Sequence, residues 1–130
     1  MAFMQPLRHH PDMIHLSVVL DCQDPEALAR FWVEALGYRQ EAANTDFIGL
    51  RDPERKRPTL VLQRVPEPKA VKNRMHLDLF SDRFDADQQR LRELGAAVVV
   101  DEHIEEDGMR IVIMADPAGN EFCLLEHPGD

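Results

Sequence analysis

The sequence predicts an α+β fold made of two βαβββ modules. The order of strand and helix patterns over residues 14–65 is repeated over residues 74–126. Ile14-His15-Leu16 opens the first half as Met75-His76-Leu77 opens the second, and the helix of each half ends in Leu-Gly. An amphipathic helix is expected to cover the apolar face of its strands. The opposite strand faces of both halves can then line a shared cleft.

The first module is predicted to contain one strand, one helix and three further strands. Apolar residues alternate over 14–20, which is the period of a half-buried strand. Asp24 is a good N-cap, Pro25 suits the first helical position, and Gly37 ends the helix. Strands are then expected over 38–43, 46–50 and 59–65.

The second module repeats this order. We expect a strand over 74–80 and a helix over 84–94, which Gly95 ends. Further strands are expected over 96–100, 109–115 and 121–126. The acidic run over 101–107 is predicted to form a solvated hairpin that ends at Gly108.

Composition indicates one acidic domain, over residues 14–130, that follows a flexible arm over residues 1–13. The chain has 130 residues and a formal net charge of −9. Phosphates and anionic lipids repel such a surface, so we expect no nucleic-acid or membrane partner. No apolar run has the length of a signal peptide or membrane span, which predicts a cytoplasmic protein. Cys22 and Cys123 are then expected to be free thiols.

Polar residues alternate along the strand faces that point away from the predicted helices. These candidates for a binding site are His15 and Ser17 in the first strand, Arg74, His76 and Asp78 in the fifth, and Cys123 in the last. His15, His76 and Cys123 have side chains that bind zinc and other first-row metals. The alternative is a polar pocket without a metal, in which Asp78 fixes the tautomer of His76.

The same residues suggest acid–base chemistry. Imidazole transfers protons near neutral pH, so His76 is a candidate catalytic residue that Asp78 orients. A buried histidine that only satisfies a hydrogen bond is the competing interpretation. Cys123 is interpreted as a buried, unreactive thiol. Lys69, Lys72 and Arg74 concentrate positive charge that either meets an anionic ligand or faces solvent.

Three segments resemble glyoxalase-like domains of the vicinal oxygen chelate superfamily: Asp21 to Trp32 with Leu36-Gly37, Lys72 to Leu79, and Asp116 to Cys123. The resemblance implies two βαβββ modules that form a curved mixed sheet around a cleft, with helices outside, and a homodimer. Metal-using members place ligands on the first and last strand of each module. His76 takes one such position, Cys123 and Leu60 stand where carboxylates are expected, and the fourth position falls on His15 or Ser17.

We therefore expect a protein that binds a small molecule in the cleft and has no resident cofactor. His15, Ser17, Arg74, His76 and Asp78 would supply polar contacts. Phe47, Leu60 and Leu62 would form an apolar wall. One alternative is a metal-dependent lyase or dioxygenase-type enzyme, in which His15, His76 and Cys123 hold Zn, Ni, Fe or Mn. A second alternative is a regulatory or interaction module with a vestigial cleft.

Overall fold

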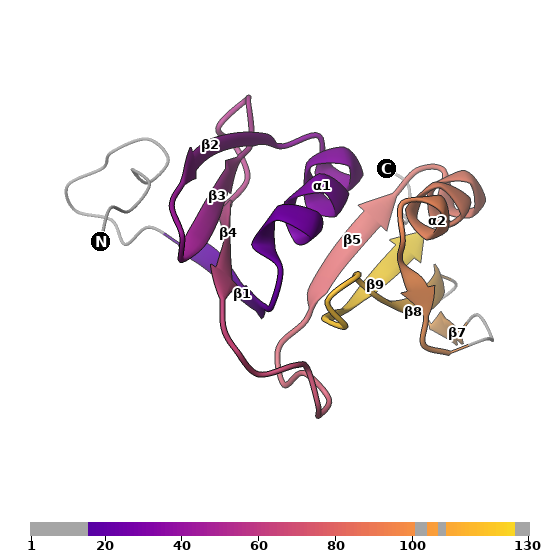
Figure 1. Ribbon diagram of the computed structural model, residues 1–130. Helices are drawn as coiled ribbons and strands as arrows, with labels where there is room; N and C mark the ends of the chain where they lie inside the picture. The colour runs from indigo at the N-terminus through magenta and orange to yellow at the C-terminus, as the bar shows by residue number, and fades with distance from the viewer. Residues whose placement is uncertain (1–15, 101–103, 107–108, 127–130) are drawn as a thin grey trace. The chain divides into compact units, whose positions relative to one another are not determined.

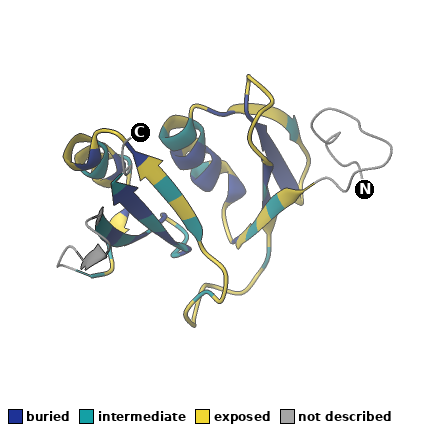
Figure 2. Cartoon of the chain, turned by 180° about the vertical axis from the view of Figure 1, so that it is seen from behind, coloured by how far each residue is buried: buried dark blue, intermediate teal, exposed yellow. Residues whose placement is uncertain are grey.

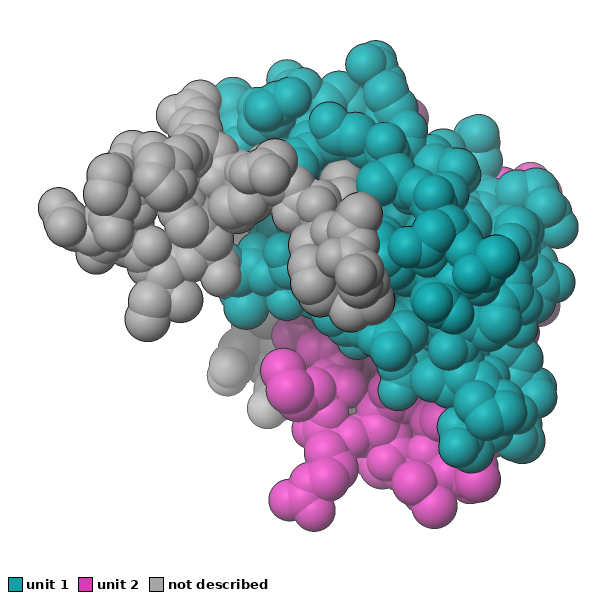
Figure 3. Space-filling view, turned by 60° about the vertical axis from the view of Figure 1, so that its left-hand side comes forward, with its two compact units in different colours: residues 1–68 teal, residues 69–130 magenta. Residues whose placement is uncertain are grey.

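The computed structural model describes residues 16–100, 104–106 and 109–126. The chain divides into two compact units, residues 1–68 and residues 69–130 (Figure 3). Each unit is described by itself below. No helix in the described part of the chain has the length and apolar character needed to cross a membrane.

The first unit is a four-stranded mixed sheet with one helix (Figure 1). Its elements are β1 (Ser17–Cys22), α1 (Pro25–Leu36), β2 (Arg39–Ala43), β3 (Phe47–Arg51) and β4 (Thr59–Arg64). The strand order is β1-β4-β3-β2, with β1 parallel to β4 and the other neighbours antiparallel. This is the βαβββ order that the sequence predicts.

Helix α1 begins and ends where its capping residues predict. The carboxylate of Asp24 accepts a hydrogen bond from the backbone N–H of Ala27 at 3.2 Å, and Pro25 occupies the first helical position. Gly37 has a φ of 71°, a left-handed conformation that glycine adopts without a Cβ clash. Its N–H donates to the carbonyl of Val33 at 2.9 Å. These contacts fix the length of the helix that covers the sheet.

The core of the first unit lies between α1 and one face of the sheet. Leu28 and Trp32 of the helix are 1% exposed, and Leu50 and Leu62 of the sheet are fully buried. Cross-strand pairing places Leu62 beside Leu20 and Ile48, so these side chains share the face that α1 covers. Apolar burial on this scale supplies most of the stability of a small unit.

The turn between β3 and β4 is organised around Asp52, which is 1% exposed. Its carboxylate accepts hydrogen bonds from the backbone N–H groups of Glu54, Lys56 and Arg57 at 3.0–3.1 Å. Burial alone would raise the pKa of Asp52. These amides and the Arg57 side chain outweigh burial and lower that pKa from 3.8 to about 2.

The second unit repeats the topology of the first. Its elements are β5 (Leu77–Ser81), α2 (Phe84–Glu93), β6 (Ala97–Val98), β7 (Ile104–Glu106), β8 (Met109–Ala115) and β9 (Glu121–Glu126). The strand order is β5-β9-β8-β6, with β7 also paired to β8. β5 is parallel to β9, as β1 is to β4. The predicted α+β class with two βαβββ modules is therefore confirmed, and the described strands form two separate mixed sheets.

Helix α2 covers the face of the second sheet that contains Val112, Met114 and Phe122, which are 0–1% exposed. Figure 2 shows exposed residues along β5 and buried ones along β8. Arg110 of β8 ties the start of α2 to the sheet. Its guanidinium pairs with Asp85 at 3.1 Å and with Glu126 at 2.9 Å.

Most strand bounds differ from the prediction by one to three residues, and the start of β5 changes the setting of a candidate site residue. β5 begins at Leu77 rather than at residue 74, because Leu77 is the first residue with a partner, Phe122, on β9. His76 therefore lies immediately before the strand. The acidic run contains the short strand β7, and residues 101–103 and 107–108 of the predicted hairpin lie outside the described residues, as does the predicted arm.

Candidate functional site

The fold of the second unit brings three chemically active side chains together on the sheet face that α2 does not cover. Asp78 of β5 is the register partner of Cys123 on β9, so both side chains project from the same face. His76 precedes the strand by one residue and shares this alternation. One ligand atom from each of the three side chains lies within 4.8 Å of the other two.

His76 and Asp78 lie within ion-pair distance of each other, as the sequence suggests. Nε2 of His76 lies 3.1 Å from Oδ1 of Asp78, and their side chains are 44% and 45% exposed. An imidazole has two ring nitrogens that can donate or accept a proton, and the carboxylate lies beside one of them. The pair can therefore take up or deliver a proton at an exposed surface, which is the geometry of a general acid–base group.

The surroundings of Cys123 favour the protonated form of its thiol. Burial raises the pKa of the Cys123 thiol, and the negative charge of Asp78, to which the thiol donates a hydrogen bond, raises it further. The positive charge of Lys72 acts in the opposite direction and is a smaller cause than burial or Asp78. Because the thiolate is the reactive form, Cys123 is a poor nucleophile at neutral pH.

Glu121 anchors the connector between the units beside this cluster. Its carboxylate accepts hydrogen bonds from Nζ of Lys69 at 3.1 Å and from the backbone N–H of Asn73 at 3.3 Å, and Lys72 lies 3.7 Å away. The hydrogen bond from Lys69 is the main reason that the pKa of Glu121 is lowered. Glu121 thus pairs with both Lys69 and Lys72. Arg74 is exposed and has no ion pair with another described residue.

The donor set of the cluster fits a divalent metal. An imidazole nitrogen, a carboxylate oxygen and a thiolate sulfur all bind zinc, at about 2.0–2.3 Å from the ion, so Cys123 would lose its proton on binding. The three atoms now span up to 4.8 Å, so the half-exposed His76 and Asp78 would need to turn toward a shared ion. A fourth position would remain for water or substrate, as in catalytic zinc sites.

The remaining predicted site residues lie in the first unit or outside the described residues. Ser17 is exposed on the edge strand β1. Phe47 is 5% exposed and lies on the sheet face opposite to that of its neighbour Ile48. His15 lies outside the described residues, so its predicted place in the site stays a prediction.

The structure corrects the predicted apolar wall. Leu60 and Leu62 pair with Val18 and Leu20 of β1, which places them on the face covered by α1. They are 3% and 0% exposed and belong to the core. The prediction of an apolar wall did not use strand pairing, and the register with β1 decides which side these two residues take.

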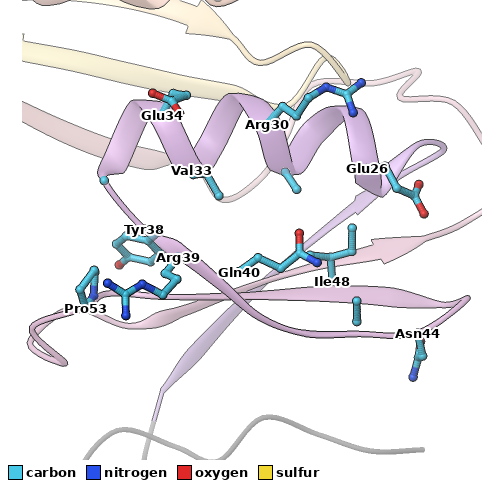
Figure 4. Close-up of a pocket in the computed structure, with 13 residues that line it drawn as sticks. Glu26, Arg30, Val33, Glu34, Tyr38, Arg39, Gln40, Asn44, Ile48 and Pro53 are labelled. Atoms are coloured by element: carbon cyan, nitrogen blue, oxygen red, sulfur yellow. The ribbon is translucent and has the colours of Figure 1, made fainter.

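Sequence reasoning missed a groove beside α1 in the first unit. Helix residues Ala29 and Val33 and strand residues Gln40 and Ile48 are among those that line it (Figure 4). The spacing of residues 26, 29, 30, 33, 34 and 37 along one side of a helix is a signal that could have indicated this surface.

Each unit is thus a sheet with a helix on one face and polar side chains on the other, repeated along the chain. This arrangement defines the class of paired βαβββ proteins. The family model described as "Glyoxalase-like domain" matches residues 17–125. The chain belongs to this glyoxalase-like family, within the vicinal oxygen chelate superfamily.

Solved structures share the fold at low sequence identity. A glyoxalase/bleomycin resistance protein/dioxygenase family enzyme from Burkholderia phytofirmans is 16% identical, with a TM-score of 0.70 over 85% of this chain and 95% of that one. A glyoxalase-related enzyme from Fulvimarina pelagi is 19% identical, with a TM-score of 0.68 over 88% and 90%. A lactoylglutathione lyase from Agrobacterium tumefaciens is 18% identical, with a TM-score of 0.62 over 90% and 95%. No curated protein matches the sequence.

Proposed function

We propose that this protein binds a small organic molecule on the open face of the second sheet. The observation that carries the proposal is the gathering of His76, Asp78 and Cys123 on a face that α2 leaves uncovered. Phe80 follows Asp78 on the same face of β5 and is 56% exposed. A polar cluster beside an exposed aromatic ring is the usual composition of a small-molecule site.

The polar groups have separate roles in this proposal. His76 and Asp78 contact a polar group of the ligand, and any chemistry uses His76 as the acid or base that Asp78 orients. Arg74 favours an anionic ligand because its guanidinium has no ion pair within the described residues. Phe80 supplies an apolar wall, in place of Leu60 and Leu62.

A ligand panel tests this proposal. Protein in chelator is screened by thermal shift against organic acids and aromatic metabolites, and hits are mapped by amide NMR. We expect at least one compound to stabilise the protein and to shift the amides around Asp78. Asp78→Asn should abolish that stabilisation, whereas Asp46→Asn, at an exposed carboxylate in the first unit, should preserve it. A panel without a binder would favour a regulatory or interaction module instead.

A metal-dependent lyase or dioxygenase-type enzyme is the second candidate. Its supporting observation is the three-donor cluster, in which Asp78 joins the expected ligands His76 and Cys123. A bound divalent ion would polarise an oxygen of the substrate. Metal analysis of protein purified without chelator would then give about one ion per chain, and His76→Ala would lose it. A negligible metal content, with no stabilisation by added Zn²⁺, Ni²⁺, Fe²⁺ or Mn²⁺, would reject this candidate.

We also propose a cytoplasmic homodimer. Met75 and Phe80, beside and within the edge strand β5, are 86% and 56% exposed, which supports burial against a second copy. Cys22 and Cys123 are both free, which supports a reducing compartment. Light scattering should give twice the mass of one chain, and Phe80→Asp should halve it.

A further inference from the structure

A groove runs between α1 and the edge strand β2 in the first unit (Figure 4). Its volume is about 770 Å³, which lies within the range of small-molecule pockets. It lies on the helix-covered side of its sheet, whereas the candidate site lies on the open face of a different sheet. Ligand binding in this groove therefore does not depend on the function proposed for the second unit.

Apolar side chains line the middle of the groove, between the helix and the strands. Val33 points from the helix toward the strands, and Ile48 points from β3 toward the helix (Figure 4). Ala29 and Ala43 complete this lining, and their small side chains leave the space open. Gln40 places its amide between the helix and the sheet, and Gln40 has no side-chain hydrogen bond within the described residues. The interior thus suits a slender apolar chain.

One end of the groove is polar and positively charged. Arg39, Tyr38 and Pro53 gather there, and Arg39 forms no ion pair with another described residue. The acidic groups of the lining are already engaged. Glu26 binds Arg64 through both carboxylate oxygens at 2.9 and 3.0 Å, and Glu34 also has a partner. Arg30 also lines the groove, but its side chain points away from the strands (Figure 4). The guanidinium of Arg39 is therefore the positive charge at this end that a ligand between the helix and the strands would meet.

We propose that this groove binds an amphipathic monocarboxylate, with its carboxylate at Arg39 and its apolar chain along Val33, Ala43 and Ile48. Charge complementarity supports an anion, since an exposed arginine pairs with carboxylates in preference to neutral groups. The length of the groove supports a medium-chain acid. From residue 26 to residue 37 the helix side of the groove extends about 16 Å at 1.5 Å per residue.

Decanoate is the probe, and its binding is followed by amide NMR on the full chain below the concentration at which it forms micelles. We expect saturable shifts at Val33, Gln40 and Ala43, with no saturable shift at Asp78. Arg39→Gln should weaken binding by up to about five-fold, the upper end of the range for one exposed charge pair. Decanamide has the same chain but no charge. Its affinity for the unsubstituted protein should be lower than that of decanoate by a similar factor.

Two further variants test the place of the ligand. Ala43 is exposed on β2, and strands tolerate aromatic residues, so Ala43→Phe should fold. The larger side chain should fill the groove and abolish binding. Arg92→Gln removes an exposed arginine from α2 in the second unit and should leave the affinity unchanged. The proposal is wrong if decanoate causes no saturable shift at the groove. It is also wrong if decanamide binds as tightly as decanoate, or if Arg92→Gln weakens binding as much as Arg39→Gln does.

Discussion

Truncation of Leu62 to alanine tests whether this residue lies in the core or in a ligand site. Leu62 is fully buried between Leu20 and Ile48 under α1. The change removes about three methylene equivalents, each worth about 0.8 kcal/mol on burial. The cavity left behind adds to this loss, so we expect Leu62→Ala to lower the free energy of unfolding by about 3 kcal/mol.

Val61→Ala is the matched control, because Val61 is the adjacent residue on β4 and projects from the opposite face. It is only partly buried, so we expect a loss of about 1 kcal/mol or less. Urea unfolding followed by the fluorescence of Trp32, in the same unit, measures both changes. A Leu62→Ala variant within about 1 kcal/mol of the unchanged protein, or a larger loss for Val61→Ala, would refute the assignment of Leu62 to the core.

Three other predictions concern charge, the thiol and a helix end. The pKa of Asp52 is about 2 in the folded protein, below its ordinary 3.8. The ionised carboxylate therefore stabilises the fold above about pH 4, and this stabilisation is lost as the pH falls through about 2. Asp52→Asn should make the urea midpoint depend less on pH between pH 5 and pH 2. Because Asp78 raises the pKa of Cys123, Asp78→Asn should speed the alkylation of Cys123 by iodoacetamide at pH 7. Mass spectrometry of the peptide that contains Cys123 measures the rate. An unchanged rate would contradict the coupling between Asp78 and Cys123. Gly37→Ala should lower the free energy of unfolding by about 1 kcal/mol, measured by urea unfolding, because φ at this position is 71° and no neighbouring atom would contact the new Cβ.

The architecture could be predicted because local signals agree with the global fold. Asp24, Pro25 and Gly37 mark the ends of α1 at the residues where the structure has them. Strands are predicted over residues 109–115 and 121–126, and these are the observed bounds of β8 and β9. The start of β5 was predicted too early, since strand length depends on the pairing partner, which lies about 45 residues away in sequence.

The candidate site was only partly predictable. Alternation placed His76, Asp78 and Cys123 on one face, because the period of a strand follows from the backbone alone. Leu60 and Leu62 were misplaced because an alternating apolar run on its own does not say which face a helix covers. The groove at α1 was missed because its lining comes from two elements whose spacing is set by packing.

The position of the aromatic residues has a practical consequence for optical work on this protein. The chain has one tryptophan and one tyrosine, Trp32 and Tyr38, and both are buried in the first unit. Tryptophan and tyrosine fluorescence therefore reports the unfolding of residues 1–68 and does not report directly on residues 69–130. A tryptophan introduced at Phe122, which is 1% exposed in the second unit, would give that half its own chromophore. Comparison of the two signals would reveal whether the halves melt as one cooperative body.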